Sequence, residues 1–295
     1  FFFFFFFLMI RRPPRSTLSS SWQRQMCIRD REIIGLKDDK RAKICNAEIL
    51  TIGYMAVRYF HGNYYSAHQF YMSMKPSYPI DYSRFIRRLN SLHYVIDSTF
   101  HVLSELFYKT ANSKIYSVDS FPVEVCKLER SQTCNIYNHK DMKGYNASKK
   151  RFFYGFKVHM VVTTEKEPLH CYISYANEHD ATAAKRYLPA MKESSSVVGD
   201  KGYVSRKLSN FLTKFGVNLN AIQRSNMGED KEYFIKRKLR KKVETAFSII
   251  TGRFGNVIKA TSIDGFLTKL KLFITAYSMD CFFKLSDEQQ KLLAI

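Results

Sequence analysis

Hydrophobic side chains follow two different spacings in this chain, and the change from one to the other falls near Ala111. Before it, apolar residues recur at every third or fourth position, which is the period of a helix with one face on a core. This spacing predicts helices over 46–59 and about 65–74, and a third that starts at Asp81 or Ser83. Asn46 is the expected cap of the first helix.

Beyond Ala111, short β-branched and aromatic runs predict strands with helical stretches between them. The expected strands cover 114–123, 152–164, 168–176, 197–199 and 217–222. The expected helices cover 181–191 with Asp180 as cap, a stretch between Ser205 and Gly216, 233–251, and 264 to about 285. This order of strands and helices is that of a ribonuclease-H-like domain. We therefore expect an α/β fold with a mixed five-stranded sheet and flanking helices, preceded by a small all-α domain.

The chain divides into four expected segments. Residues 1–31 open with a run of Phe and continue into a stretch that resembles translated sequencing-adapter read-through. We interpret them as a disordered, non-native leader and expect the authentic amino terminus to be missing. A helical DNA-binding segment follows at 32–110, then an α/β catalytic segment at 111–285 and a tail at 286–295.

Charge and cysteine content narrow the class of protein. The net charge is +21, from 47 Lys and Arg against 26 Asp and Glu, which favours a polyanionic partner, either nucleic acid or an anionic membrane. No apolar run approaches the roughly 20 residues of a membrane span, and we expect DNA rather than a membrane as the partner. Six scattered cysteines indicate neither a disulfide framework nor a structural zinc, and they fit a reducing cytoplasm.

Two basic stretches are candidates for DNA contact. One face of the third helix carries Arg84, Arg87 and Arg88, which is typical of a helix-turn-helix-like unit or of an ordinary bundle with a solvated face. A long insertion, 126–150, interleaves aromatic and basic residues in the manner of a loop that follows phosphates and stacks on bases, although a merely solvated loop has the same pattern. Its candidates are Lys140, Lys143, Lys149 and Lys150, among Tyr137 and Tyr145.

Three carboxylates stand out in the second half of the chain. Asp119 lies within an apolar strand, Asp200 follows the strand 197–199 in a glycine-flanked turn, and Glu244 lies on the basic helix 233–251. Each acid can also be explained by structure alone. Asp119 could be a strand-end residue, Asp200 a turn former, and Glu244 a surface partner of Arg240. Glu244 borders the expected core stripe of that helix, which comprises Ile235, Leu239, Val243, Ala246 or Phe247, and Ile250.

Carboxylates in this number point to metal chemistry. Mg²⁺ is a hard ion that is held by a few carboxylates together with phosphate and water oxygens. Two such ions can activate an attacking oxygen and stabilise a leaving one during phosphoryl transfer. We therefore expect Asp119, Asp200 and Glu244 to hold two Mg²⁺ ions, with Mn²⁺ as a substitute.

Several motifs together resemble the bacterial DDE transposases, most closely the insertion sequence 982 family. They are Val118-Asp119-Ser120, Tyr154-Gly155-Phe156-Lys157-Val158-His159, Gly199-Asp200-Lys201-Gly202-Tyr203 and Arg240-x-x-x-Glu244-x-x-Phe247. The resemblance implies Asp119, Asp200 and Glu244 as the catalytic metal-binding triad and Arg240 as the basic residue one turn before the third acid. Related transposases often carry a Lys seven residues after the Glu, where this chain has Thr251, so Arg253 or Lys259 is the candidate replacement.

The expected activity is Mg²⁺-dependent cleavage and strand transfer at the ends of a bacterial insertion sequence. The expected partners are double-stranded DNA, as terminal inverted repeats and target, and a second copy of the chain in a dimer or higher oligomer. Arg237, Arg240 and Lys241 of the basic helix complete the set of DNA-binding candidates. Two alternatives remain open: a ribonuclease-H-like nuclease that cuts without strand transfer, and a truncated, inactive transposase that only binds DNA.

Overall fold

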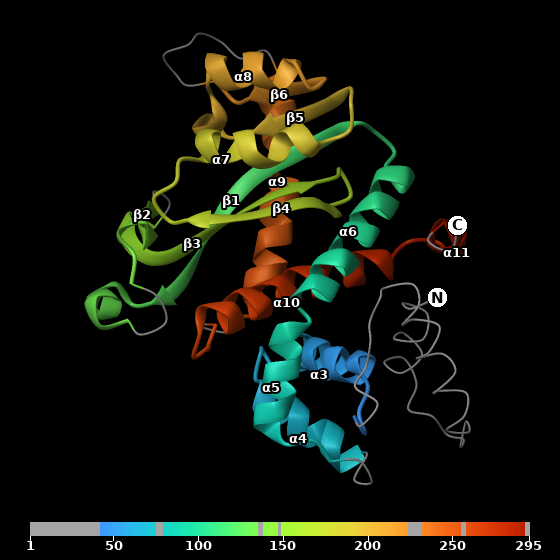
Figure 1. Cartoon of the computed structure of the whole chain (residues 1–295). Coiled ribbons are helices and arrows are strands. Elements are labelled where there is room, and N and C mark those ends of the chain that lie inside the picture. Colours follow the sequence, from blue (N-terminus) through green and yellow to red (C-terminus); the bar gives the residue numbers. More distant parts are fainter. Residues whose placement is uncertain are drawn as a thin grey trace.

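The structure is a computed structural model, which describes residues 42–74, 79–134, 138–146, 149–223, 232–254 and 258–292. The expected leader, most of the linker at 75–79, and Tyr137 lie outside these residues. Within them, a cluster of helices leads into a mixed sheet that carries helices on its faces (Figure 1). The expected α/β class is therefore confirmed.

The described part of the helical cluster contains one more helix than expected. Its members are α3 (Asn46–Tyr59), α4 (Tyr64–Met74), α5 (Tyr82–Ser91) and α6 (His93–Thr110). The apolar stripe that was assigned to one helix is divided at Leu92, because Phe85 and Leu89 are buried on α5 whereas Val95 and Ile96 are buried on α6. Asp81 caps α5 as expected, accepting from the backbone N–H groups of Ser83 and Arg84.

The cap of α3 corrects a prediction. Cys45, not Asn46, is the N-cap residue, and its backbone N–H donates to Glu48 Oε2 at 3.0 Å. Asn46 instead accepts a hydrogen bond from Arg88 Nη2 at 2.7 Å. The amide that was expected to cap its own helix thus ties α3 to α5.

Among the residues that the structure describes, the sheet has six strands, one more than expected. They are β1 (Ile115–Cys126), β2 (Lys143–Asn146), β3 (Arg151–Val162), β4 (Pro168–Tyr175), β5 (Ser195–Gly199) and β6 (Val217–Ala221). Strand β1 lies between β3, to which it is antiparallel, and β5, to which it is parallel. Strand β6 continues the sheet parallel to β5, while β2 and β4 both pair with β3.

The additional strand comes from the insertion that was read as a loop. Its described residues form two short 3-10 helices, η1 (Leu128–Thr133) and η2 (Lys140–Met142), followed by β2. Strand β2 is short and pairs with β3 only from Lys143 to Asn146. Four residues with a Gly at the second position give a weak strand signal, which explains why the pattern was missed.

The remaining helices are α7 (Asp180–Tyr187), α8 (Arg206–Thr213), α9 (Tyr233–Gly252), α10 (Ile263–Phe282) and α11 (Asp287–Lys291), with η3 (Leu188–Ala190) after α7 and η4 (Lys201–Tyr203) after β5. Helix α11 lies in the expected tail. Ser205 caps α8, and Gly216, at φ 69°, follows the end of that helix as expected. The described helices include none that is long and apolar enough to span a bilayer.

Helix α10 joins the helical cluster to the sheet (Figure 1). A side chain at Gly53 of α3 would meet Leu89 of α5 at 2.9 Å and Leu272 of α10 at 3.4 Å. At the other side of α10, the ring of Phe266 lies 5.8 Å from that of Phe156 on β3. The buried apolar residues accordingly form one continuous core.

Candidate active site

The three carboxylates reach one place from three separate elements. Asp119 lies in the middle of β1, Asp200 directly follows the last residue of β5, and Glu244 lies in the second half of α9. Strands β1 and β5 are parallel neighbours whose pairing ends at Val118 and Gly199. Asp119 and Asp200 each follow the last paired residue of their strand, so the two acids lie at the same edge of this strand pair.

Arg240 connects all three acids. Its guanidinium lies 3.4 Å from Asp119 Oδ2 through Nε, 3.1 Å from Asp200 Oδ1 through Nη1 and 2.7 Å from Glu244 Oε1 through Nη2. The surface-type pair between Glu244 and Arg240, four residues apart on one helix, is therefore present. It is one part of a larger cluster, because the same guanidinium also binds the two strand acids.

Helix α9 is held against β1 by contacts on both sides of Asp119. Ser117, two residues before Asp119, donates from Oγ to the backbone carbonyl of Leu239 at 2.8 Å. Phe121, two residues after it, packs its ring 4.6 Å from that of Phe247. Since alternate residues of a strand share a face, this spacing places Asp119 against Arg240.

The turn after β5 sets the position of Asp200. Tyr203 is fully buried, and its backbone N–H donates to the Asp200 carbonyl at 2.9 Å, which closes η4. The Tyr203 side chain fills the space beside Gly199, where a Cβ would lie 3.0 Å from the tyrosine Cγ. A larger residue at 199 would be tightly crowded by this ring, so the close approach of the turn to the strand favours glycine there.

Burial and charge compete at this site. Burial raises the pKa of Asp119 from its ordinary 3.8 to about 7, in spite of a hydrogen bond from the Ser120 N–H and the nearby Arg240 cation, which lower it. The negative charges of Asp200 and Asp180 act in the same direction as burial. Burial lowers the pKa of Arg240, but the three acids outweigh burial and raise that pKa. Arg240 therefore stays charged while Asp119 holds its proton weakly near neutral pH.

A fourth acid, Asp180, lies against Ser120, the residue after Asp119. It was not assigned to the site from the sequence. It was expected to cap α7, but His179 occupies the N-cap position and Asp180 is the first helical residue. Its Oδ1 accepts from Ser120 Oγ at 2.9 Å and lies 3.5 Å from Lys157 Nζ. A Cβ on Gly202 would lie 3.1 Å from Asp180 Oδ2. Asp180 thus lies next to Ser120 and Gly202, residues that lie close to Asp119 and Asp200 in sequence.

His159 completes this second group. The ring is fully buried, its Nδ1 lies 3.8 Å from Asp180 Oδ1, and burial lowers its pKa to about 4. Ser174 Oγ donates to the Tyr175 carbonyl, so it accepts from His159 Nε2, 2.8 Å away. Lys157 and His159 are two residues apart in an apolar strand. Two polar side chains on the same face of an apolar strand are the sequence signal that could have revealed the cluster of Asp180, Lys157 and His159.

The donor set fits a divalent cation in chemistry, since it consists of carboxylate oxygens that already surround one cation. In the present arrangement that cation is the Arg240 guanidinium. Among the residues that the structure describes, no three His, Cys, Asp or Glu side chains are grouped as ligands of a metal ion. Arg240 accounts for this, because each acid points at its nitrogens.

The candidate replacement for the Lys absent at position 251 is engaged elsewhere. Arg253 forms an ion pair with Asp280 on α10, whereas Thr251 donates to the carbonyl of Phe247. Lys259 accepts through its backbone carbonyl from the Nζ of Lys269. The structure does not bring either basic side chain to the three acids.

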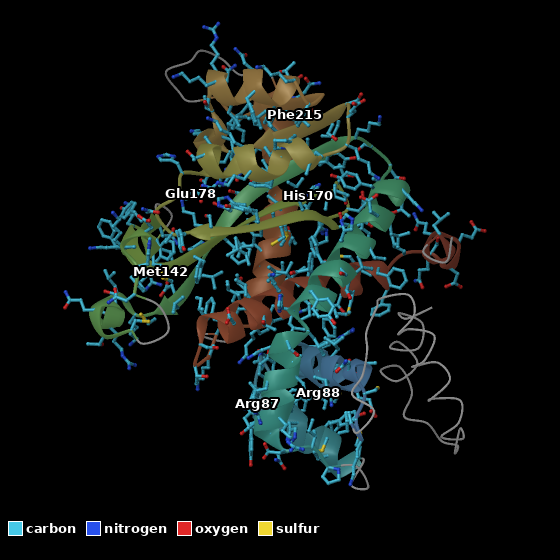
Figure 2. All side chains as sticks on the ribbon, in the orientation of Figure 1. Arg87, Arg88, Met142, His170, Glu178 and Phe215 are labelled. Carbon is cyan, nitrogen blue, oxygen red and sulfur yellow. The ribbon has the colours of Figure 1, made fainter. Side chains whose placement is uncertain are left out.

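The other DNA-binding candidates are spread over the molecule. Arg84 and Arg87 are exposed on α5, whereas Arg88 is half-buried and donates to the Ile44 carbonyl at 2.8 Å. Figure 2 shows Arg87 and Arg88 at the end of the molecule opposite Phe215. The insertion supplies Lys140 on η2, Lys143 on β2, and Lys149 and Lys150 before β3.

Lys143 lies over an aromatic ring, with its Nζ 5.3 Å from the centroid of Phe152. Phe152 and Tyr145 are both exposed and pack edge to face. The expected mixture of cations and aromatics is therefore present at the β2–β3 pair. Arg237 and Lys241 are exposed on α9, on either side of Arg240 in sequence.

The basic helix differs from its prediction at one end. Val243, Ala246, Phe247 and Ile250 are buried as expected. Ile235, which was assigned to the core stripe, is 64% exposed, and Lys236 is buried in its place. The error arises because the first two turns of α9 contribute no apolar side chain to the core.

The comparison with protein families identifies the class. The family model described as "Transposase DDE domain" matches residues 109–258, about half of the chain and the part that contains all three acids. The chain belongs to this family of DDE transposases, enzymes that cut and transfer DNA strands.

Other comparisons add little. Among solved structures, the chain is similar to the piggyBac transposase in a cryo-EM structure of its synaptic complex with hairpin DNA, at 10% identity and a TM-score of 0.47. That similarity covers 89% of this chain and 74% of the other. At this score it supports no statement about the site. No curated protein matched the chain.

Proposed function

We propose that this transposase belongs to a bacterial insertion sequence, most similar to the insertion sequence 982 family, and that it cleaves element ends and joins them to target DNA. The observation that carries the proposal is the convergence of Asp119, Asp200 and Glu244 on one guanidinium. The strand order β4-β3-β1-β5-β6, with the first three antiparallel, supports a ribonuclease-H-like catalytic domain.

Asp119, Asp200 and Glu244 would hold the metal, which we propose to be two Mg²⁺ ions, with Mn²⁺ as a substitute. Ions held there would supply activation of the attacking oxygen and stabilisation of the leaving oxygen in an in-line displacement. The carboxylate of Asp119 must lose its proton to serve as a ligand, and its raised pKa links that loss to cation binding. Arg240 balances the acids in the absence of metal and remains beside the DNA phosphates as a fixed cation.

The basic residues are proposed to hold the two DNA molecules. Arg84 and Arg87 lie on an exposed helix face that suits a helix-turn-helix-like contact with the terminal repeat. Lys140, Lys143, Lys149 and Lys150 lie on or next to the β2–β3 pair, where they suit the flanking phosphates. Joining two element ends requires two active sites, so we propose a dimer or higher oligomer on DNA, in the bacterial cytoplasm.

The first test separates catalysis from DNA binding. Asp119→Asn, Asp200→Asn and Glu244→Gln should each abolish cleavage of a terminal-repeat duplex taken from the DNA that flanks the gene. Binding of the same duplex should stay within a few-fold, because each variant keeps the shape of the side chain. Asp264→Asn, at an exposed acid in the first turn of α10, is the matched control. Joint loss of binding and cleavage would argue against the assignment.

A second test separates the transposase from a nuclease that only cuts. A labelled donor end should appear covalently joined to a longer target strand when Mg²⁺ is present. Shortened donor strands without any joined product would favour the nuclease. If the wild-type protein binds the repeat but gives neither product with Mg²⁺ or Mn²⁺, the alternative of an inactive, DNA-binding transposase applies.

A further inference from the structure

The first turn of α9 exposes three consecutive apolar side chains. Tyr233 is 38% exposed, Phe234 79% and Ile235 64%. The rings of Tyr233 and Phe234 pack edge to face at 5.6 Å. Large apolar side chains with this much exposure are more than a core needs, and they mark a surface that contacts another molecule.

The exposed turn is aligned with the active site. Tyr233, Arg237, Arg240 and Glu244 are spaced by four, three and four residues, so they lie along one face of the helix. Phe234 and Lys241 are seven residues apart on the neighbouring face. At 1.5 Å per residue, Tyr233 lies about 10 Å along the axis from Arg240, which equals roughly three nucleotide steps of a DNA strand.

Cations surround the exposed rings. Arg237, Lys238 and Lys241 are exposed and Lys242 is half-buried. Within the part of the chain that the structure describes, none of these four side chains takes part in an ion pair with an acid, whereas Arg240 is paired with three. The surface thus combines aromatic faces with uncompensated positive charge, which suits a nucleic acid strand. A protein partner would have to place acidic side chains opposite each of these basic residues.

We propose that Tyr233 and Phe234 form a stacking platform for an unpaired base of the DNA strand, about three nucleotides from the phosphate that is cleaved. Arg237 contacts the phosphate between the platform and the three acids. The inference rests on the proposed function, because it takes the position of the cleaved phosphate from the three acids. It adds to that function a base-contacting residue pair that fixes how far the strand is drawn into the site.

Photochemical crosslinking tests the platform without relying on turnover. The probe is a pre-cleaved repeat duplex with a short single-stranded overhang at its 3′ end, carrying 5-iodouracil at one of several successive positions. Irradiation with the full chain carrying Asp119→Asn, followed by mass spectrometry, should give a crosslink to Tyr233 or Phe234 from one position, about three nucleotides from the reactive end. Crosslinks confined to other elements would overturn the proposal.

Affinity measurements on the same probe provide the second readout. Phe234→Ala should weaken binding of the overhang duplex by about fivefold to tenfold, the effect of losing one aromatic–base stack, and Phe234→Trp should restore it. Phe70→Ala is the control, because Phe70 is also exposed (47%) but lies on α4, in the helical cluster (Figure 1). Equal effects of the two alanine variants would overturn the platform.

The outcomes for platform and catalysis are separable. Cleavage by the wild-type protein without a crosslink to α9 would overturn the platform and leave the proposed function intact. A crosslink in a protein that never cleaves would support the platform and count against catalysis. If Phe234→Ala dissociates a dimer in the absence of DNA, as measured by sedimentation, the exposed turn is a protein interface and the proposal fails.

Discussion

The two halves of α9 differ in how much of their apolar surface is buried. The second half buries Val243, Phe247 and Ile250 against the sheet, while the first half exposes Phe234 and Ile235. Arg240 and Glu244 lie where the two halves meet. A helix that is anchored at one end and free at the other can hold a catalytic acid rigidly and still extend toward a substrate.

The difference also shows what positions the side chains of the candidate site. Asp119 and Arg240 meet because packing and one hydrogen bond, from Ser117 to the Leu239 carbonyl, fix the helix on the strand. Among the described residues, Tyr233, Phe234 and Ile235 of the first turn have no such hydrogen bond or ring contact with the sheet. Substitutions in the two halves should therefore separate effects on stability from effects on DNA.

The largest expected effect is on the anchored half. Phe247→Ala removes a buried ring that packs on Phe121, so the free energy of unfolding should fall by about 3 to 4 kcal/mol. Phe234→Ala removes a ring of the same size from the exposed half and should change it by less than about 0.5 kcal/mol. Denaturant titration of both variants makes the comparison, and similar losses would contradict the division of α9.

The next effect concerns pH and the metal-free protein. The folded-state pKa of Asp119 is about 7 and its ordinary value is 3.8, so the unfolded chain releases this proton at lower pH than the folded one. The stabilising contribution is thus complete below about pH 4 and lost as the pH rises to 7, by up to about 4 kcal/mol.

Asp119→Asn removes this titration. With a chelator present, the wild type should lose melting temperature relative to the Asp119→Asn variant as the pH rises from 4 to 7. Above pH 7 the difference between the two melting temperatures should stay constant. Addition of Mg²⁺ at pH 7 should stabilise the wild type and not the variant. A difference that is independent of pH would contradict the raised pKa.

Arg240→Ala is expected to act at the junction of the two halves. It leaves three acids without their shared cation, and should lower the free energy of unfolding in chelator by about 2 kcal/mol, a value reduced for partial exposure. Arg237→Ala, one turn away on the same helix, should have almost no effect on stability. Thermal unfolding of the two variants tests this expectation. Part of the stability lost in Arg240→Ala should be recovered when Mg²⁺ is added.

The smallest expected effect belongs to Asp180. Asp180→Asn keeps an acceptor for Ser120 but removes the charge that faces Lys157, so cleavage should slow by about tenfold while repeat binding stays unchanged. Asp180→Glu, which retains the charge, should recover part of the rate. An unchanged rate in Asp180→Asn would show that the second group of polar residues serves folding only.

Much of the fold could be predicted from local patterns. The hairpin of β3 and β4, the helix after Ser205 and the extent of α9 follow from alternation, caps and helical spacing, and each was confirmed. Strand β2 and the separation of α5 from α6 could not be predicted, because a four-residue strand and a break at Leu92 leave no strong signal. Ile235 was misplaced since spacing tells which residues share a face, not whether the sheet extends far enough to cover them.

The three acids could be selected from the sequence, but their surroundings could not. Asp119, Asp200 and Glu244 each stood out by type and local context. The shared contact with Arg240 depends on the register of α9 on β1, and the role of Asp180 depends on which face of the sheet α7 covers. Both are long-range packing facts that neither periodicity nor capping rules contain.

The measurement that tests the central claim most directly is strand joining by the intact protein. A labelled repeat end is incubated with target DNA and Mg²⁺, and the products are resolved by length. The wild type should join the labelled 3′ end to a target strand, and Asp119→Asn should bind the same end but yield no joined product. Joining that survives in Asp119→Asn, Asp200→Asn and Glu244→Gln would contradict the assignment of the three acids.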